Sequence, residues 1–197
     1  MNQWLQPFFL ASASPRRAKL LDEAGIEVVS SPPNCDDGVL TCGTMPVERW
    51  VQALSILKAQ NVSRRLDEDR GTVLAADTVC VIDGFILGQP KSKNEARRML
   101  RAMLNRKHDV LTGWCLSSVG KQQLSCGYER SEITIGSIDE EEIEKYLCTL
   151  NWEGKAGGYN LSDRVDAGWP IVCGGDPTNV MGLPMNRIRQ ELNRYKD

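Results

Sequence analysis

The sequence predicts an α/β fold in which helices flank a mixed β-sheet. Apolar, strand-like segments interleave with amphipathic helical segments along the 197 residues, which favours a sheet covered by helices. The middle strands follow one another as hairpins, a connection that joins antiparallel neighbours. No linker, repeat or low-complexity tract separates these segments, so we expect a single domain over residues 1–197.

The first elements predicted are a buried strand over residues 8–11 and the helix that follows it. The strand is the apolar run Phe-Phe-Leu-Ala. Ser14 is expected to cap the helix and Pro15 to begin it, because proline lacks the N–H group that a first helical position leaves unpaired. Gly25 is expected to end the helix, where a positive φ costs glycine little.

Turn and cap residues mark the later elements. Asp83-Gly84 is a hairpin-turn signal, Ser92 suits an N-cap, and Pro184 is expected to kink or restart the last helix. The later elements expected are a strand over 26–30, a loop over 31–45, a helix over 46–65, strands over 72–82 and 85–87, a helix over 93–104, strands over 108–119 and 122–136, a helix over 139–150, a glycine-rich loop over 154–176 and a helix over 178–195.

The composition favours a soluble, cytoplasmic protein. The chain is 41% hydrophobic and 25% charged with a net charge of −2, so we expect neither a nucleic-acid partner nor a membrane span. The N-terminal residues lack the charged-then-apolar pattern of an export signal. Seven scattered cysteines without a CxxC pair, together with a single histidine, predict reduced thiols and no structural zinc site.

Residues 12–17 predict an anion site at the start of the first helix. A strand that feeds a helix N-terminus directs backbone N–H groups and the positive end of the helix dipole to one point. Arg16 and Arg17 add guanidinium groups at that point. Ser12 and Ser14 add hydroxyls, and the whole set suits a phosphate group. The alternative is an ordinary helix start whose arginines are solvated.

Polar side chains interrupt the apolar strand predicted over 72–82. Asp77 and Thr78 lie inside the run, and a buried carboxylate is costly unless it is paired or binds a metal ion. Asp77 is therefore the first candidate for catalysis, the alternative being a carboxylate satisfied by a nearby cap or arginine. Lys58 borders the apolar face of the helix over 46–65, either as a partly buried functional residue or as an exposed lysine whose stem covers apolar surface.

Short motifs follow one another in order from about Leu10 to Leu192. They are SASPRR, LKA, AADT, DGFILGQPKS, HDVLTG, SEITI, GKAGGY and NVMGLP. Their order and spacing resemble the Maf family, the nucleoside triphosphate pyrophosphatases once described as septum-formation inhibitors. The resemblance implies homodimers and a mixed, strongly bent β-sheet with two lobes around a cleft, similar to the inosine triphosphate pyrophosphatases. It also implies hydrolysis of the α–β phosphoanhydride of a nucleoside triphosphate to a monophosphate and pyrophosphate, with Mg²⁺, Mn²⁺ or Co²⁺.

The same resemblance implies roles for single residues. Ser12, Arg16 and Arg17 match the phosphate-binding loop of the family. Lys58 matches a lysine that faces the triphosphate, and Asp77 matches a carboxylate that activates water or holds the metal ion. Both are therefore expected to be catalytic.

Further residues are expected to hold the metal ion or the substrate. Asp37 matches an acid of the family's cleft loop, where the usual residue is glutamate. Asp77, Asp37 and Glu132 suit a metal ion that takes few protein ligands and completes its shell with substrate oxygens. Ser14 and Thr78 are additional candidates for substrate binding.

Departures from the family pattern bear on the substrate. Gln89 stands where the family has the lysine of GKP, and Ser162 stands where pyrimidine-preferring members have the glutamine of GIQ. Both are expected to contact the substrate. Cys80 and the Asp-Pro of GGDPTNVMGLP resemble the branch that acts on methylated guanosine triphosphate. The alternative function is a nucleotide-binding regulatory protein with weak or no catalysis.

Overall fold

The computed structural model describes residues 4–35, 40–120 and 124–193. Its strands are β1 (Phe8–Ala11), β2 (Val29–Ser30), β3 (Thr72–Ile82), β4 (Phe85–Leu87), β5 (Arg106–Ser118), β6 (Leu124–Ile135) and β7 (Ile171–Gly174). Its helices are α1 (Pro15–Glu23), α2 (Val47–Ser63), α3 (Lys93–Met103), α4 (Glu140–Cys148), α5 (Leu161–Asp166), α6 (Pro177–Val180) and α7 (Met185–Asn193), with a 3₁₀ turn, η2, at Ala156–Gly158.

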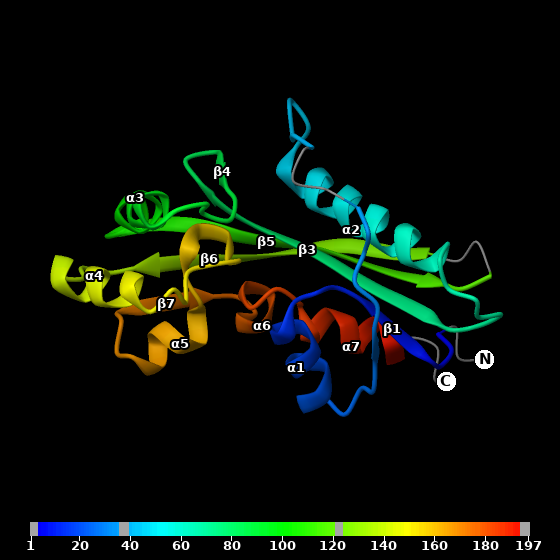
Figure 1. The fold of residues 1–197 in the computed structure, drawn as a ribbon. Coiled ribbons are helices and arrows are strands. Elements are labelled where there is room, and N and C mark those ends of the chain that lie inside the picture. Colours follow the sequence, from blue (N-terminus) through cyan, green and yellow to red (C-terminus); the bar gives the residue numbers. More distant parts are fainter. Residues whose placement is uncertain (1–3, 36–39, 121–123, 194–197) are drawn as a thin grey trace. The chain divides into compact units, whose positions relative to one another are not determined.

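The strands form a mixed sheet with flanking helices, which confirms the predicted fold class. The seven-stranded sheet has the order β2-β1-β3-β5-β6-β7, and β4 pairs with β3 (Figure 1). Strand β1 is parallel to both β2 and β3. The pairs β3–β4 and β6–β7 are antiparallel. Both orientations therefore occur in one sheet, as hairpins combined with helical crossovers require.

The chain divides into two compact units, which we describe separately. Unit 1 comprises Met1–Asp77, Thr112–Glu129 and Gly182–Asp197, and unit 2 comprises Thr78–Leu111 and Arg130–Met181. The long strands β3, β5 and β6 contribute residues to both units. The single domain expected over 1–197 stays a prediction.

In unit 1, helix α2 packs on the face of β1 and β3 that carries Phe9 and Val73. In Figure 1, α2 lies on one side of β1, and α1 and α7 lie on the other. A close approach fixes α2 on β5, because a Cβ atom at Gly113 would lie only 2.1 Å from the carbonyl oxygen of Val51. The core on this face consists of Phe9, Ala11, Ala59, Val62, Val73, Ala75, Cys115 and Val119.

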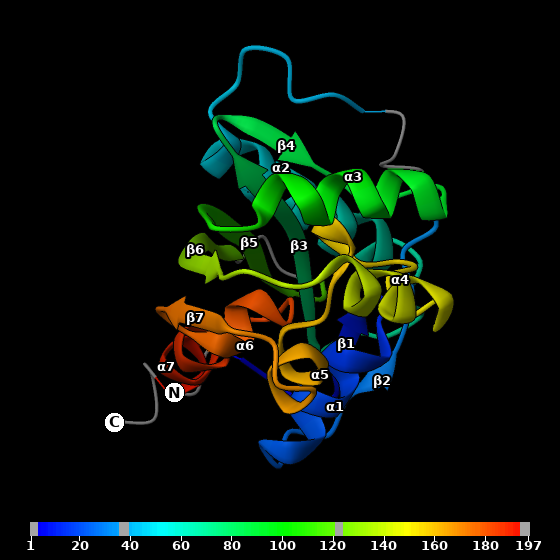
Figure 2. The same cartoon turned by 90° about the vertical axis from the view of Figure 1, so that its left-hand side faces the viewer.

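In unit 2, helices α3 and α4 lie side by side (Figure 2). Arg97 of α3 and Glu144 of α4 form a bidentate ion pair, with 2.9 Å between Nη2 and Oε2. Arg101 pairs with Glu140 one turn along the same helices. The core of this unit includes Cys80, Ile82, Leu100, Met103, Val110, Ile133, Ile135, Ile143, Tyr146, Leu147, Trp152, Tyr159, Leu161 and Trp169.

Several sequence signals predict their elements correctly. Strand β3 covers the predicted residues 72–82, and the turn at Asp83-Gly84 leads into the antiparallel strand β4. The Ser92 hydroxyl accepts a hydrogen bond of 3.2 Å from a first-turn N–H group of α3, so it caps that helix. The last helical segment is interrupted before Pro184, which separates α6 from α7.

The glycine-rich segment 154–176 is not the continuous loop that the sequence predicts. It contains η2, α5 and β7. Strand β7 has only four residues, and its backbone groups are bonded by antiparallel pairing with β6. Four residues that include a glycine carry too little periodicity to identify a strand from sequence. The strand predicted over 26–30 is also too long, because the observed strand is limited to Val29–Ser30.

The seven cysteines are free thiols, as predicted. Burial raises the pKa of the Cys80 thiol to about 12, so this side chain is an apolar part of the core. Within the part of the chain that the structure describes, no helix combines the length and apolar character needed to cross a bilayer.

Candidate functional site

The loop between β1 and α1 folds around the hydroxyl of Ser12. Ser12 is 5% exposed, and its Oγ accepts a hydrogen bond of 3.1 Å from the backbone N–H of Ser14. The same oxygen accepts a second hydrogen bond, also 3.1 Å, from Nη1 of Arg17. Ser14 is at the N-cap position of α1 and Pro15 is its first residue, as predicted, but the Ser14 side chain accepts no capping hydrogen bond from the described residues. The fold therefore brings the side chains of Ser12 and Arg17 together, with the backbone of Ser14.

Arg17 is held from a second direction. Its Nε donates a hydrogen bond of 2.7 Å to the backbone carbonyl of Gly182, in the segment between α6 and α7. Gly182 has a φ of 104°, a conformation that favours glycine. Arg16 lies beside Arg17 in the first turn of α1 and is half-buried. Cationic side chains thus stand at the N-terminal end of a helix, where an anion is stabilised.

Lys58 and Asp77 form a buried ion pair. Lys58 Nζ lies 2.5 Å from Asp77 Oδ1, and the two side chains are 13% and 11% exposed. Asp77 shares a strand face with Val73 and Ala75, which pack on α2, and Lys58 belongs to that helix. Mutual pairing offsets much of the cost of removing both charges from water. Asp77 therefore has a lysine as its partner, and Lys58 is not the exposed lysine of the alternative interpretation.

The strand register places this ion pair next to the serine–arginine loop. Strand β1 is parallel to β3, with Ala11 opposite Ala75. Ser12 therefore follows beside the next residue of β3, and Asp77 lies one residue further on. Neighbouring strands are about 4.8 Å apart, so both features occupy the same end of the β1–β3 pair in unit 1.

Of the residues in unit 2 that are expected to contact the substrate, Gln89 lies in a loop and Ser162 in a short helix. Gln89 is exposed and follows Gly88, whose carbonyl accepts a hydrogen bond of 3.0 Å from the Gly157 N–H. Ser162 lies in the first turn of α5, and its Oγ donates to Oδ1 of Asn160 at 3.2 Å. The motifs GQP and GKAGGY are therefore joined directly through their backbones.

The predicted metal ligands are not assembled as a group within the described residues. Asp37 lies outside those residues. Glu132 on β6 is 53% exposed, and its carboxylate lies 2.8 Å from Lys107 Nζ, which raises the pKa of that lysine through a hydrogen bond. Thr78 follows Asp77 in β3 and points to the opposite face of the strand. In the described ranges, no cluster of three or more His, Cys, Asp or Glu side chains could hold a metal ion.

Sequence reasoning missed residues that shape the loops of the site. Gly182 orients Arg17, and the NVMGLP motif was the signal that could have identified it. In unit 2, His108 and Tyr159 form a buried hydrogen bond of 2.8 Å. Burial lowers the pKa of His108 to about 4, so its imidazole is neutral at pH 7. The motifs HDVLTG and GKAGGY carry these two residues.

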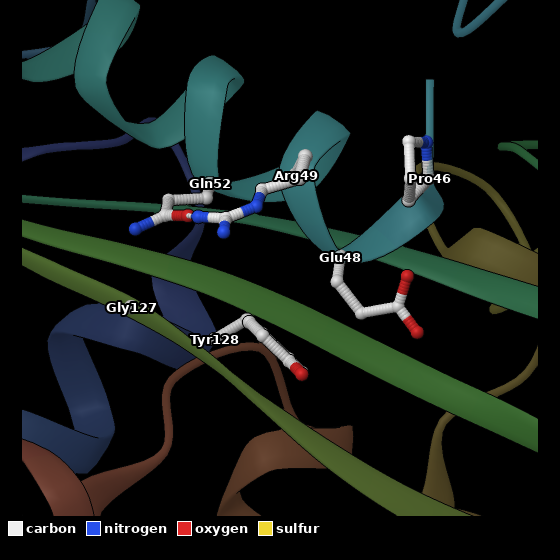
Figure 3. Close-up of a pocket in the computed structure, with 6 residues that line it drawn as sticks. All are labelled: Pro46, Glu48, Arg49, Gln52, Gly127 and Tyr128. Carbon is white, nitrogen blue, oxygen red and sulfur yellow. Dashed lines mark hydrogen bonds between the residues drawn. The ribbon is translucent and has the colours of Figure 1, made fainter. Parts of the chain in front are cut away.

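A surface pocket in unit 1 lies beside the N-terminal end of α2 (Figure 3). Arg49 and Gln52 are engaged with their neighbours there: Arg49 Nη1 lies 3.4 Å from Gln52 Oε1, and Gln52 Nε2 donates to Cys126 Sγ at 3.2 Å. No described lining residue belongs to the predicted site. The pocket is lined by Pro46, Glu48, Arg49, Gln52, Gly127 and Tyr128.

Comparison with known proteins identifies relatives along nearly the whole chain. The model of the family described as Maf-like protein matches residues 7–195. The chain is 36% identical over 192 residues to a dTTP/UTP pyrophosphatase of Rhodopirellula baltica, covering 97% of this chain and 83% of the relative. It is 37% identical over 193 residues to a dTTP/UTP pyrophosphatase of Bacillus cytotoxicus, covering 97% and 96%. A solved nucleoside-triphosphatase (dITP/XTP pyrophosphatase) of Mycobacterium abscessus aligns with a TM-score of 0.41 and 13% identity, over 65% of this chain and 72% of that one.

Proposed function

This chain belongs to the Maf-like protein family and is a nucleoside triphosphate pyrophosphatase, and we propose that it acts on the pyrimidine nucleotides dTTP and UTP with a divalent metal ion. The reaction is hydrolysis between the α and β phosphates, which releases a nucleoside monophosphate and pyrophosphate. The names of the relatives support the pyrimidine substrates, and the chemistry of the site supports the reaction.

The observation that carries the proposal is the ion pair of Lys58 and Asp77 beside the Ser12–Arg17 loop. Phosphoryl transfer requires little covalent chemistry from the protein. It requires cations that neutralise the phosphate oxygens and a group that places the attacking water. The loop and Lys58 supply cations and hydrogen-bond donors, and Asp77 supplies the carboxylate.

Each residue has a distinct task in this mechanism. Ser12 and Gly182 fix the guanidinium of Arg17, so it meets the phosphates without a further loss of side-chain freedom. Lys58 balances the charge of Asp77 in the free enzyme and faces the triphosphate when substrate binds. Asp77 then accepts the proton of the attacking water or holds the metal ion.

The donor set fits a small divalent cation that prefers oxygen ligands. Magnesium-type ions are bound through one or two carboxylates, with phosphate oxygens and water completing the shell. Asp77 would be the described ligand, and Asp37 is a further proposed one. A bound ion would neutralise charge on the phosphate oxygens. Lys58 contacts one carboxylate oxygen of Asp77, Oδ1, so a metal ion would share this carboxylate with the lysine.

Cys80 and Asp176, which resemble residues of the branch that acts on methylated guanosine triphosphate, have a structural role in unit 2. Cys80 is fully buried, with its Sγ 3.7 Å from Sδ of Met103. Asp176 caps α6, where its Oδ1 accepts a hydrogen bond of 2.8 Å from the Thr178 N–H. Both contacts explain these residue types by packing and capping, so they do not argue for a purine substrate.

The proposal is tested by pyrophosphate release from dTTP, UTP, ATP, GTP and 7-methylguanosine triphosphate, each with Mg²⁺, Mn²⁺ or Co²⁺ and with a chelator. We expect kcat/KM to be highest for dTTP and UTP and turnover to stop when the metal ion is chelated. Preference for the methylated guanosine nucleotide would overturn the substrate. Binding of nucleotides without turnover under every condition would favour the regulatory alternative.

A further inference from the structure

We propose that the buried hydrogen bond between Tyr159 and His108 positions the two segments of unit 2 that carry Gln89 and Ser162. This positioning sets which nucleoside triphosphate the enzyme prefers. The inference rests on the proposed function and on the expectation from the sequence that Gln89 contacts the phosphates and Ser162 the base. Neither Tyr159 nor His108 touches the substrate in this scheme, so both are positioning residues.

The geometry of the Tyr159–His108 pair fixes the orientation of both side chains. Tyr159 Oη and His108 Nε2 are 2.8 Å apart, and the residues are 5% and 3% exposed. Their rings meet edge to face, with 5.7 Å between centroids and 87° between planes. His108 Nδ1 is buried and finds no hydrogen-bond partner among the described residues. Two phenylalanines could fill this space without an unsatisfied polar atom, so the gain from the polar pair is directional.

The turn that carries Tyr159 is fixed by further hydrogen bonds. Tyr146 Oη donates to the carbonyl of Gly158 at 3.0 Å. Gly157 and Gly158 have φ values of 71° and 76°, and a Cβ atom at Gly157 would lie 3.2 Å from the Cys80 side chain. The backbone of η2 therefore has little freedom to adopt another path once Tyr159 is in place.

The segments that carry Gln89 and Ser162 are both attached to this turn. On one side, the Gly157 N–H donates to the carbonyl of Gly88, the residue before Gln89. On the other side, Tyr159 is followed directly by Asn160, whose Oδ1 accepts the hydrogen bond of Ser162. Anchoring the turn on β5 through His108 therefore sets the position of Gln89 and of Ser162 at the same time.

The charged groups proposed for catalysis are not part of this assembly. Lys58 and Asp77 belong to unit 1, and the contacts of the Tyr159–His108 pair lie within unit 2. Loosening the anchor should therefore change KM and the ratios between nucleotides more than it changes kcat. A general loss of stability would lower the turnover of every nucleotide alike.

The test compares Tyr159→Phe with Tyr128→Phe, the same chemical change at a 45% exposed tyrosine of unit 1. We expect Tyr159→Phe to reduce the preference for dTTP over GTP about tenfold, mainly through KM, because recognition depends on placed polar groups. Hydrogen exchange of the amides in 156–162 should rise about tenfold or more in the same variant. Tyr128→Phe should change neither quantity. His108→Gln, which keeps a polar group at the end of the side chain, should lie between wild type and Tyr159→Phe.

The outcomes separate this inference from the proposed function. If wild type shows no turnover, the proposed function fails, and the exchange of 156–162 still decides whether Tyr159 anchors the turn. If wild type discriminates between nucleotides and Tyr159→Phe leaves the ratios unchanged, the inference is overturned. Equal loss of kcat for all nucleotides in Tyr159→Phe, without faster exchange in 156–162, would also overturn it.

Discussion

Each of the two units contains a buried polar pair, and the two pairs differ in charge. In unit 1 the pair is charged, with Lys58 and Asp77 2.5 Å apart. In unit 2 it is neutral, with His108 and Tyr159 2.8 Å apart and the pKa of His108 lowered to about 4 by burial. A charged pair can exchange its partner for phosphate or a metal ion, whereas the neutral pair of unit 2 is proposed to hold a turn in position. The difference separates groups suited to chemistry from groups suited to positioning.

The two pairs also differ in the secondary structure that carries them. Lys58 belongs to a helix of 17 residues and Asp77 to a strand of 11 residues, so regular structure fixes their separation. Tyr159 ends a short glycine turn that has no such support. His108 of β5 adds a fixed point to the hydrogen bonds that hold this turn. Sites built on regular elements are more precise than sites on loops, and loops need an anchor of this kind.

The largest effect is expected for Asp77→Asn. Loss of the carboxylate that places water or the metal ion should reduce kcat by about 10²–10⁴, with nucleotide affinity largely retained. The change is measured by single-turnover pyrophosphate release and nucleotide binding, with Asp67→Asn on the exposed surface as the matched control. Wild-type turnover in Asp77→Asn would remove Asp77 from the reaction.

Lys58→Met leaves the charge of Asp77 buried without its partner. The free energy of unfolding should fall by about 3–5 kcal/mol, because breaking a buried ion pair from one side exposes the full cost of desolvation. Chemical denaturation of Lys58→Met, Asp77→Leu and the double variant measures it. The double variant should regain most of the loss. If the loss in the double variant equals the sum of the two single losses, the pair is not energetically coupled.

The neutral pair predicts a dependence of stability on pH. From pH 6.5 down to about 4, the unfolded chain protonates His108 and the folded chain does not, so the free energy of unfolding falls as the pH is lowered. At about 1.36 kcal/mol per pKa unit, the difference between 6.5 and about 4 amounts to about 3 kcal/mol.

The contribution of His108 is obtained from urea unfolding of wild type and His108→Phe between pH 7.5 and 4. Wild type should lose stability more steeply than the variant, since other titrating groups contribute to both curves. Parallel curves would show that His108 is not the buried neutral group described here.

The smallest effect is expected for Gln89→Lys. Gln89 is exposed, so a lysine there should improve kcat/KM by about fivefold at most, and equally for each nucleotide, because it acts on the phosphates they share. Gln190→Lys on the exposed side of α7 controls for net charge. Rates that shift from one nucleotide to another would instead assign Gln89 to base recognition.

The sequence was sufficient where one local pattern determined the structure. The apolar run of β3 with its single interrupting acid identified the strand and Asp77, and Ser92 identified the start of α3. Helix α5 and strand β7 were missed because glycines hide their short patterns, and β7 depends on pairing with β6.

Partners distant in the chain could not be predicted either. His108 and Tyr159 are 51 residues apart, and nothing in the sequence around either residue indicates the other as its hydrogen-bond partner. Lys58 and Asp77 were both singled out, but only the packing of α2 on β3 shows that they pair with each other. Periodicity indicates which face of an element is buried and does not indicate which side chain it meets.

The hydrogen bond from Arg17 to Gly182 has a consequence for synthesis of the protein. The two residues are 165 positions apart, so the first helix leaves the ribosome long before the carbonyl that orients its arginine has been made. At about 5–20 residues per second, a nascent chain spends roughly ten seconds or more without that contact. The anion loop therefore acquires its final geometry only when nearly the whole chain has been translated, and an incomplete chain ending before Gly182 carries the motif without the contact that orients it.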